Sequence, residues 1–329
     1  MRLKKIIPRL VLFSVALFGL AVEAHARRVR MAIAVPGKSE IVFVTAKEKG
    51  YYNEEGLDVE LIVTGGINRL ALIAGEVDFS SSGSASIIPI LRGAPLRILY
   101  SSFYRTTLWL YGKAELRDLK SLKGKKIAIS RMGDTTDIYL REVLRRHGLE
   151  IGRDVVVLAA GQPVHRYAAL ASNTVDAAVL ADPSNFIARE AGFRELVSFL
   201  SDDTDIVHLS GSIVVRDALL QAEPATVEKF IRGTLKGLRY VRSNRAGTAS
   251  LLARNLNVGE DLAGKTYDMF RPVMTADGAV SAEMQRRAVD LQLKVLGSKE
   301  SVPMEKFIDF SLTQRISAEL DGKTIKTSR

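Results

Sequence analysis

The sequence of 329 residues contains no cysteine. This absence excludes disulfide scaffolds, thiolate metal sites, cysteine nucleophiles and a lipid-bearing N-terminal cysteine. Histidine is scarce, and beyond the first 26 residues it occurs only as His147, His165 and His208. None of the three has the paired spacing or the HExxH pattern that a metal site requires. We therefore expect neither a metal ion nor another cofactor.

Catalytic motifs are also missing. The serine-containing loops lack the G-x-S-x-G elbow of hydrolases, no G-x-x-x-x-G-K-[ST] loop occurs, and Gly65-Gly66 does not extend to a dinucleotide fingerprint. Trp109, the single tryptophan, lies among apolar residues and is expected to pack in the core. These motifs specify no reaction, so we do not expect an enzyme.

No apolar run reaches the roughly 20 residues of a membrane-spanning helix. The apolar run 10–22 follows four basic residues and precedes Ala24-His25-Ala26, the pattern of a secretory signal peptide. We predict cleavage after Ala26, with an uncleaved anchor as the alternative, and a periplasmic location. Cleavage leaves 43 basic and 36 acidic residues, a charge of +7 that is spread along the chain. Without a basic cluster interleaved with aromatic residues, no nucleic acid partner is expected.

Short β-branched segments alternate with helical patterns from Val29 onward, which is typical of βαβ units around mainly parallel sheets. We expect two α/β lobes, the first from residues 27–113 plus 212–329 and the second from 114–211. Thr107–Gly112 is expected to close the first half, with crossings between the lobes near Gly112–Arg117 and Ser210–Arg216. The C-terminal segment is mostly helical and is expected to cover the first lobe.

Ligands of open α/β sheets lie beyond the carboxyl ends of the strands, where loops lead into helices. Several such loops here are small and polar, and their hydroxyl and backbone N–H groups suit an anionic or strongly polar ligand. Ser39 is also read as a helix cap, and Asp134 as a plain N-cap. Lys38, Arg105 and Arg131 could add charge. The candidate ligand-binding residues are Gly37, Ser39, Ser82, Gly83, Ser84, Gly133, Thr135, Thr136, Gln162 and Asp182.

Five segments occur in the order found in one known family. Lys49–Glu60 resembles the G-[YF]-[FY]-x-x-E-G-L-x-V segment of the ABC-transporter substrate-binding proteins of the nitrate, sulfonate, taurine and thiamine-pyrimidine-precursor group. The other four segments are similar to that group's A-L-x-x-G-x-x-D, G-x-P-[LI], D-L-K-G-K-K-[IV]-[AG] and A-A-L-x-x-G-x-V-D-A elements, the last followed by Asp182-Pro183. Asn173 replaces the usual glycine of the last element, which is tolerable because asparagine accepts a left-handed backbone. These four segments are 70–78, 92–96, 118–128 and 168–178.

The resemblance implies a type II periplasmic-binding-protein fold, with two lobes joined by a two-segment hinge. It implies capture of a small polar or anionic organic solute by hinge closure, and delivery to an ABC permease that a separate ATPase powers. We expect a monomer. A sensor that docks on a membrane receptor is one alternative. An enzyme on the same fold is another, although the pyrimidine-precursor synthases of this kind rely on a cysteine-containing motif that is absent here.

Overall fold

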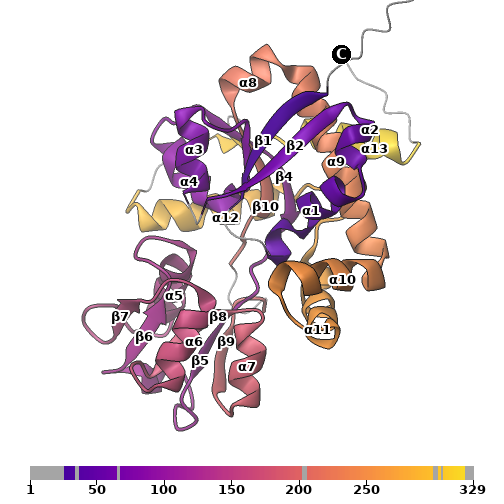
Figure 1. The fold of residues 1–329 in the computed structure, drawn as a ribbon. Coiled ribbons are helices and arrows are strands. Elements are labelled where there is room, and N and C mark those ends of the chain that lie inside the picture. The colour runs from indigo at the N-terminus through magenta and orange to yellow at the C-terminus, as the bar shows by residue number, and fades with distance from the viewer. Residues whose placement is uncertain are drawn as a thin grey trace, which may run out of the picture.

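The protein is described here from a computed structural model, which covers residues 26–33, 37–64, 67–201, 206–298, 303–304 and 307–322. The predicted signal peptide therefore lies almost wholly outside the described residues. Two sheets of five strands each form the centres of two lobes (Figure 1). The first sheet has the order β2-β1-β3-β10-β4 and the second the order β7-β6-β8-β5-β9. The two-lobed α/β prediction is confirmed.

The first sheet is buried on both faces, as the alternation of its side chains requires. Val29, Met31 and Ile33 of β1 enter one core cluster, while Ala32 between them enters another on the opposite face. β1 pairs in parallel with β2 and β3, and β10 runs antiparallel to β3 and β4. The strands are β1 (Arg27–Ile33), β2 (Leu57–Val63), β3 (Phe79–Ser80), β4 (Leu96–Phe103) and β10 (Ser210–Arg216).

The second sheet is likewise buried between two core clusters, one on each face. Ile127 and Ile129 of β6 pack on the α5 side, whereas Ala128 packs on the side of Trp109, which is buried in the core as predicted. β6 pairs in parallel with β7 and β8, and β5 runs antiparallel to β8 and β9. The strands are β5 (Leu108–Gly112), β6 (Lys126–Ile129), β7 (Val156–Ala159), β8 (Ala177–Ala181) and β9 (Arg194–Ser198).

The fourth strand of each sheet, β10 in the first and β5 in the second, directly follows a crossing between the lobes. We predicted that Thr107–Gly112 would close the first half, but β5 lies in the second sheet between β8 and β9. The first crossing is therefore 104–107, and the second is the segment from 199 to 209 between β9 and β10. The expected crossings near Gly112–Arg117 and Ser210–Arg216 are wrong, since an apolar strand pattern does not reveal which sheet the strand joins.

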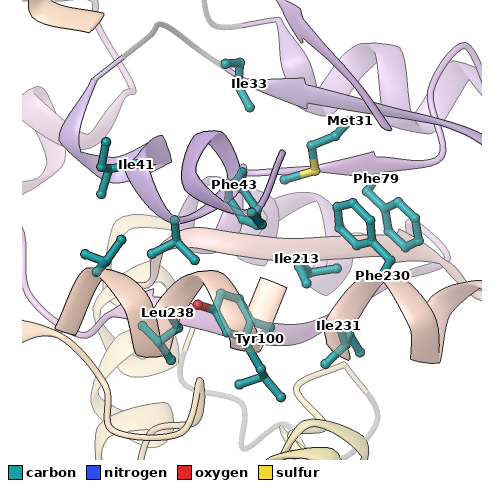
Figure 2. Close-up of a cluster of buried hydrophobic side chains, with 14 of the residues drawn as sticks. Met31, Ile33, Ile41, Phe43, Phe79, Tyr100, Ile213, Phe230, Ile231 and Leu238 are labelled. Atoms are coloured by element: carbon teal, nitrogen blue, oxygen red, sulfur yellow. The ribbon is translucent and has the colours of Figure 1, made fainter. Parts of the chain in front are cut away.

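Helices cover both faces of the first sheet. α1 and α9 pack on the face that contains Phe79, where Phe79 and Phe230 stack with ring centroids 4.2 Å apart (Figure 2). α3, α4 and α12 pack on the other face. The C-terminal helices therefore cover the first lobe, as predicted. The helices of this lobe are η1 (Lys38–Glu40), α1 (Ile41–Glu48), α2 (Tyr51–Glu54), α3 (Asn68–Ala74), α4 (Gly83–Leu91), α8 (Asp217–Ala222), α9 (Pro224–Ser243), α10 (Arg245–Leu256), α11 (Glu260–Phe270), η4 (Arg271–Val273), α12 (Ala282–Val295) and α13 (Ser311–Leu320).

The second lobe has fewer helices, and two helices of the first lobe reach it. Met269 of α11 packs against the core cluster of Trp109, and Asn185 Nδ2 donates to its sulfur at 3.8 Å. Leu291 of α12 is buried in the core cluster of α5, although α12 also packs on α4 of the first lobe. The helices of the second lobe are η2 (Lys120–Leu122), α5 (Thr135–Arg146), α6 (Pro163–Ala171) and α7 (Ser184–Glu190). Among the described residues, no helix combines the length and the apolar character needed to cross a lipid bilayer.

Candidate functional site

A cavity of about 580 Å³ lies between the two lobes. The first lobe contributes α3 and α4, the second contributes the loop between β6 and α5 with the first turns of α5, and α12 closes one side. The volume is in the range of pockets that hold a small organic molecule. Its walls are formed by Asn68, Arg69, Ser84, Ala85, Ile88, Pro89, Arg92, Arg131, Met132, Gly133, Asp134, Thr135, Ile138, Tyr139 and Gln292.

The walls carry an excess of positive charge. Arg69, Arg92 and Arg131 line the cavity, and Asp134 is the single carboxylate among the lining residues. Burial lowers the pKa of Arg69, and the charge of Arg131 from the facing lobe lowers it further. The Arg69 Nη1 donates to the carbonyl oxygen of Ala85 at 2.8 Å, which fixes the guanidinium group on the wall of the first lobe. Guanidinium groups in this arrangement are suited to bind an oxyanion.

The carboxylate of Asp134 accepts hydrogen bonds from the first residues of α5. Its Oδ1 accepts from the backbone N–H of Thr136 at 2.9 Å and of Asp137 at 3.4 Å, and from the Thr136 hydroxyl at 2.7 Å. This is the N-cap that the sequence predicts. The Gly133 N–H donates to the carboxylate of Asp137 at 2.7 Å, so it is not free for a ligand as we had expected.

A buried polar chain lies behind the cavity wall. Asn68 Nδ2 donates to the Ser81 hydroxyl at 3.3 Å, and that hydroxyl donates to Glu40 Oε1 at 3.0 Å. The second carboxyl oxygen of Glu40 is buried and has no partner within the described part of the chain. Burial raises the pKa of Glu40 to about 8, and the Ser81 hydroxyl only partly opposes this shift. Glu40 therefore holds a proton at neutral pH.

A largely buried ion pair between Lys38 and Asp182 joins the two lobes. Lys38 Nζ in η1 lies 2.8 Å from Asp182 Oδ1 in the loop after β8, and the Asp182 side chain is only 1% exposed. Thr107, at the end of the first crossing, donates to the same oxygen at 2.9 Å. Asp182 Oδ1 is thus engaged by two protein groups, and Asp182 does not line the cavity, although we had predicted it as a ligand contact.

The second crossing is tied to α5 by a hydroxyl and an imidazole. Tyr139 Oη and His208 Nδ1 are 2.5 Å apart; Tyr139 is buried and His208 is half-buried. Burial lowers the pKa of His208 to about 3, with a smaller contribution from the charge of Lys38. The imidazole is therefore neutral at pH 7, and the tyrosine hydroxyl can donate to it. This contact connects the second lobe to the end of the second crossing.

The structure brings three of the ten predicted residues to the cavity, namely Ser84, Gly133 and Thr135. The Ser84 hydroxyl also accepts from the Leu209 N–H at 2.8 Å. The remaining predicted residues do not line the cavity. Ser82 is buried between the hydroxyls of Ser80 and Ser86, each at 2.8 Å.

Gly83 is needed for close packing, because an added Cβ would lie 2.3 Å from the Leu209 carbonyl oxygen. Thr136 faces inward, where its hydroxyl also accepts from the Ser130 N–H at 2.9 Å. Gln162 is exposed before α6. Gly37 and Ser39 belong to the turn that leads into α1; Ser39 lies inside η1 and Glu40 precedes α1, so Ser39 is not the helix cap we predicted.

Sequence reasoning missed several wall residues. Asn68 and Arg69 begin α3 without a typical cap residue, and Arg92 directly follows α4. Gln292 lies in the C-terminal helix α12, far along the chain from the loops that the sequence singled out. The available signal was the placement of Arg69 and Arg92 close to the ends of first-lobe helices, but a single arginine in such a place is most often solvated. Within the described residues, no group of three histidine or acidic side chains is arranged to hold a metal ion.

The two strand orders, the antiparallel fourth strand that follows each crossing and the cavity between the lobes match the fold of the periplasmic binding proteins. The periplasmic aliphatic sulphonate-binding protein SsuA of Escherichia coli has this fold, with a TM-score of 0.66 and 21% identity over 85% of this chain and 91% of SsuA. By sequence, the chain belongs to the NMT1/THI5 like family, whose profile matches residues 39–247.

Two curated relatives have names that describe different functions, binding in one and catalysis in the other. YtlA of Bacillus subtilis (strain 168), whose name describes a binding protein, is 22% identical over 212 residues, or 61% of this chain and 62% of YtlA. The 4-amino-5-hydroxymethyl-2-methylpyrimidine phosphate synthase THI11 of Saccharomyces cerevisiae is 25% identical over 226 residues, or 63% of this chain and 64% of THI11. The chain thus matches less than two thirds of the length of either relative.

Proposed function

We propose that this protein is the extracytoplasmic solute-binding component of an ABC importer. It captures a small polar or anionic organic solute by closing its two lobes, and the closed form is then recognised by a permease that a separate ATPase powers. We further propose that the chain is exported to the periplasm after cleavage behind Ala26, and that it acts as a monomer.

The observation that carries the proposal is the cavity of about 580 Å³ with walls from both lobes. A solute held there contacts α3 and α4 on one side and the start of α5 on the other, so its contacts are complete only when the lobes are together. Moving a population from 1:99 to 99:1 in favour of the closed arrangement takes a differential affinity of about 5.5 kcal/mol. Charged hydrogen bonds from both lobes are able to supply a difference of this size.

The two crossings make the movement possible. Only 104–107 and the segment from 199 to 209 connect the sheets, so rotation about these segments separates the lobes without breaking either sheet. The Lys38–Asp182 pair and the Tyr139–His208 contact lie beside these segments, and we expect both to break when the lobes separate. Closure around a solute is therefore measurable as a change in overall dimensions.

Catalysis is the second candidate function, because the yeast relative is a synthase. The chain contains no cysteine, and the wall of the cavity combines guanidinium, hydroxyl and amide groups without a nucleophile paired to a base. We therefore propose binding without turnover. A receptor-linked sensor uses the same closure, and co-purification with a permease separates it from an importer.

The test is a thermal-shift panel that includes nitrate, sulfonates, taurine, aromatic carboxylates and pyrimidines, followed by small-angle scattering with each hit. We expect a saturable rise in melting temperature for one chemical class, together with a smaller radius of gyration. Mass spectrometry of the recovered solute should find it unchanged. Identical scattering profiles with and without a tight binder, or chemical conversion of that binder, would refute the proposal.

A further inference from the structure

The cavity contains positive charge that the protein itself leaves unbalanced. Many arginines elsewhere bind carboxylates, as Arg97 does with Asp217 at 3.0 Å and Arg315 with Glu228 at 2.9 Å. Within the part of the chain that the structure describes, Arg69, Arg92 and Arg131 have no ion-pair partner. Three guanidinium groups against the single carboxylate of Asp134 leave two positive charges on the walls.

The arrangement of these charges links them to closure. Arg69 is held on the first lobe by the Ala85 carbonyl, and Arg131 follows β6 on the second lobe. Like charges that face each other across a cleft repel when the lobes approach, and the effect of Arg131 on Arg69 indicates that they are near enough to interact. An anion between them converts this repulsion into attraction. Such an anion binds the closed arrangement selectively, as a closure switch requires.

Asp134 balances only one of the three positive charges. Its Oδ1 is already engaged by three donors at the start of α5, and its charge also acts on the buried Arg166. Ser84, Thr135 and Gln292 add hydroxyl and amide groups to the same walls, which complete the hydrogen bonding of oxyanion oxygens.

We propose that the solute is a small organic dianion, whose acidic groups lie between Arg69 and Arg131 and within reach of Arg92. This inference rests on the proposed function and narrows it from polar or anionic solutes to those with two negative charges. The shared chemistry is a phosphate monoester or a dicarboxylate, and a test can tell the two apart.

The test compares matched ligands that differ by one charge, by isothermal titration at pH 8 and low salt. Phenyl phosphate carries two charges at this pH because its second pKa is near 6, whereas phenyl sulfate of almost the same shape carries one. Phthalate and benzoate form the corresponding carboxylate pair. We expect the dianion of at least one pair to bind about tenfold more tightly or better, with the steeper loss of affinity on adding salt. A preference for phenyl phosphate over phenyl sulfate would identify a phosphate monoester, and a preference for phthalate over benzoate would identify a dicarboxylate.

Arg69→Gln and Arg131→Gln test the assignment of the residues. Each is expected to weaken binding of the preferred dianion about tenfold or more and to reduce the difference between the matched ligands. Arg131 is exposed, so its variant remains informative even where Arg69→Gln disturbs the wall near Ala85. Arg117→Gln, an equal change of charge on an exposed arginine outside the cavity, is the control and should leave both affinities unchanged.

Equal or weaker binding of both dianions, or a preference that survives both arginine substitutions, would overturn the inference. A monoanion or neutral solute that binds and closes the lobes would overturn it while leaving the proposed function intact. Failure of the proposed function looks different, since no solute class would then change the scattering profile.

Discussion

Glu40 is a carboxyl group buried beside Ser81, and its environment makes stability depend on pH. Its folded pKa of about 8 lies above the ordinary value of 4.5. The folded state therefore holds the proton more tightly, so its contribution to stability is fully present below pH 4.5 and is lost as the pH rises to about 8. The shift corresponds to roughly 3 to 5 kcal/mol.

Glu40→Gln keeps the size of the side chain and removes the titration. We expect the fall in unfolding free energy between pH 5 and pH 8, measured by urea denaturation, to be smaller in this variant by on the order of 3 kcal/mol. Glu76→Gln, on an exposed side chain, serves as the control and should follow the native pH profile. An unchanged pH profile for Glu40→Gln would contradict the assigned proton.

Single backbone positions were predictable where one physical rule dominates. Asn173 replaces a glycine of the family pattern, and its φ of 60° is the left-handed conformation that the sequence predicted. Gly83 was assigned to the ligand, yet it is required because the Leu209 carbonyl passes close to it. The sequence identifies both positions as special, but the reason for Gly83 comes from a segment more than a hundred residues away, which no local pattern contains.

At the scale of elements, the start of α5 depends on one oxygen atom. Asp134 Oδ1 accepts all three hydrogen bonds that cap this helix and fix Thr136. Asp134→Ala removes all of them, and we expect a loss of about 1 to 2 kcal/mol in unfolding free energy. Asp134→Asn keeps the accepting oxygen, so it should stay within about 0.5 kcal/mol of the native protein. Equal losses in the two variants, measured by urea denaturation, would show that the carboxylate charge matters and the cap does not.

Element type and order could be predicted from the sequence, because alternation in β1 and β6 and caps such as Asp134 are local signals. Sheet membership could not, since β5 is as apolar as its neighbours in either lobe. β9 was missed because its first residues are Arg194 and Glu195, which are exposed at the edge of the second sheet. The site depends on the same long-range information, because Arg69, Arg131 and Gln292 meet only through the packing of three separate helical regions.

At the scale of the whole molecule, side-chain contacts hold the two lobes together in addition to the crossings, and α11 and α12 of the first lobe both pack on the second. The Lys38–Asp182 pair is one of these contacts, with a distance of 2.8 Å and little exposure of either side chain. Breaking a largely buried pair by changing one partner leaves an uncompensated charge, whereas replacing both with apolar residues is often tolerated. The pair therefore contributes to the position of the lobes in the absence of solute.

Asp182→Asn keeps an acceptor for Thr107 and removes the charge that Lys38 requires. We expect it to lower the unfolding free energy by about 2 to 4 kcal/mol and to increase the radius of gyration of the solute-free protein, because Lys38 is more stable in water when the lobes separate. Apparent solute affinity should fall in proportion to the closed fraction, and a saturating solute should restore the compact dimensions. The double variant Lys38→Met with Asp182→Leu has no charge to expose and should be less destabilised than Asp182→Asn. A solute-free scattering profile that is the same for Asp182→Asn and the native protein would mean that this ion pair does not hold the lobes together.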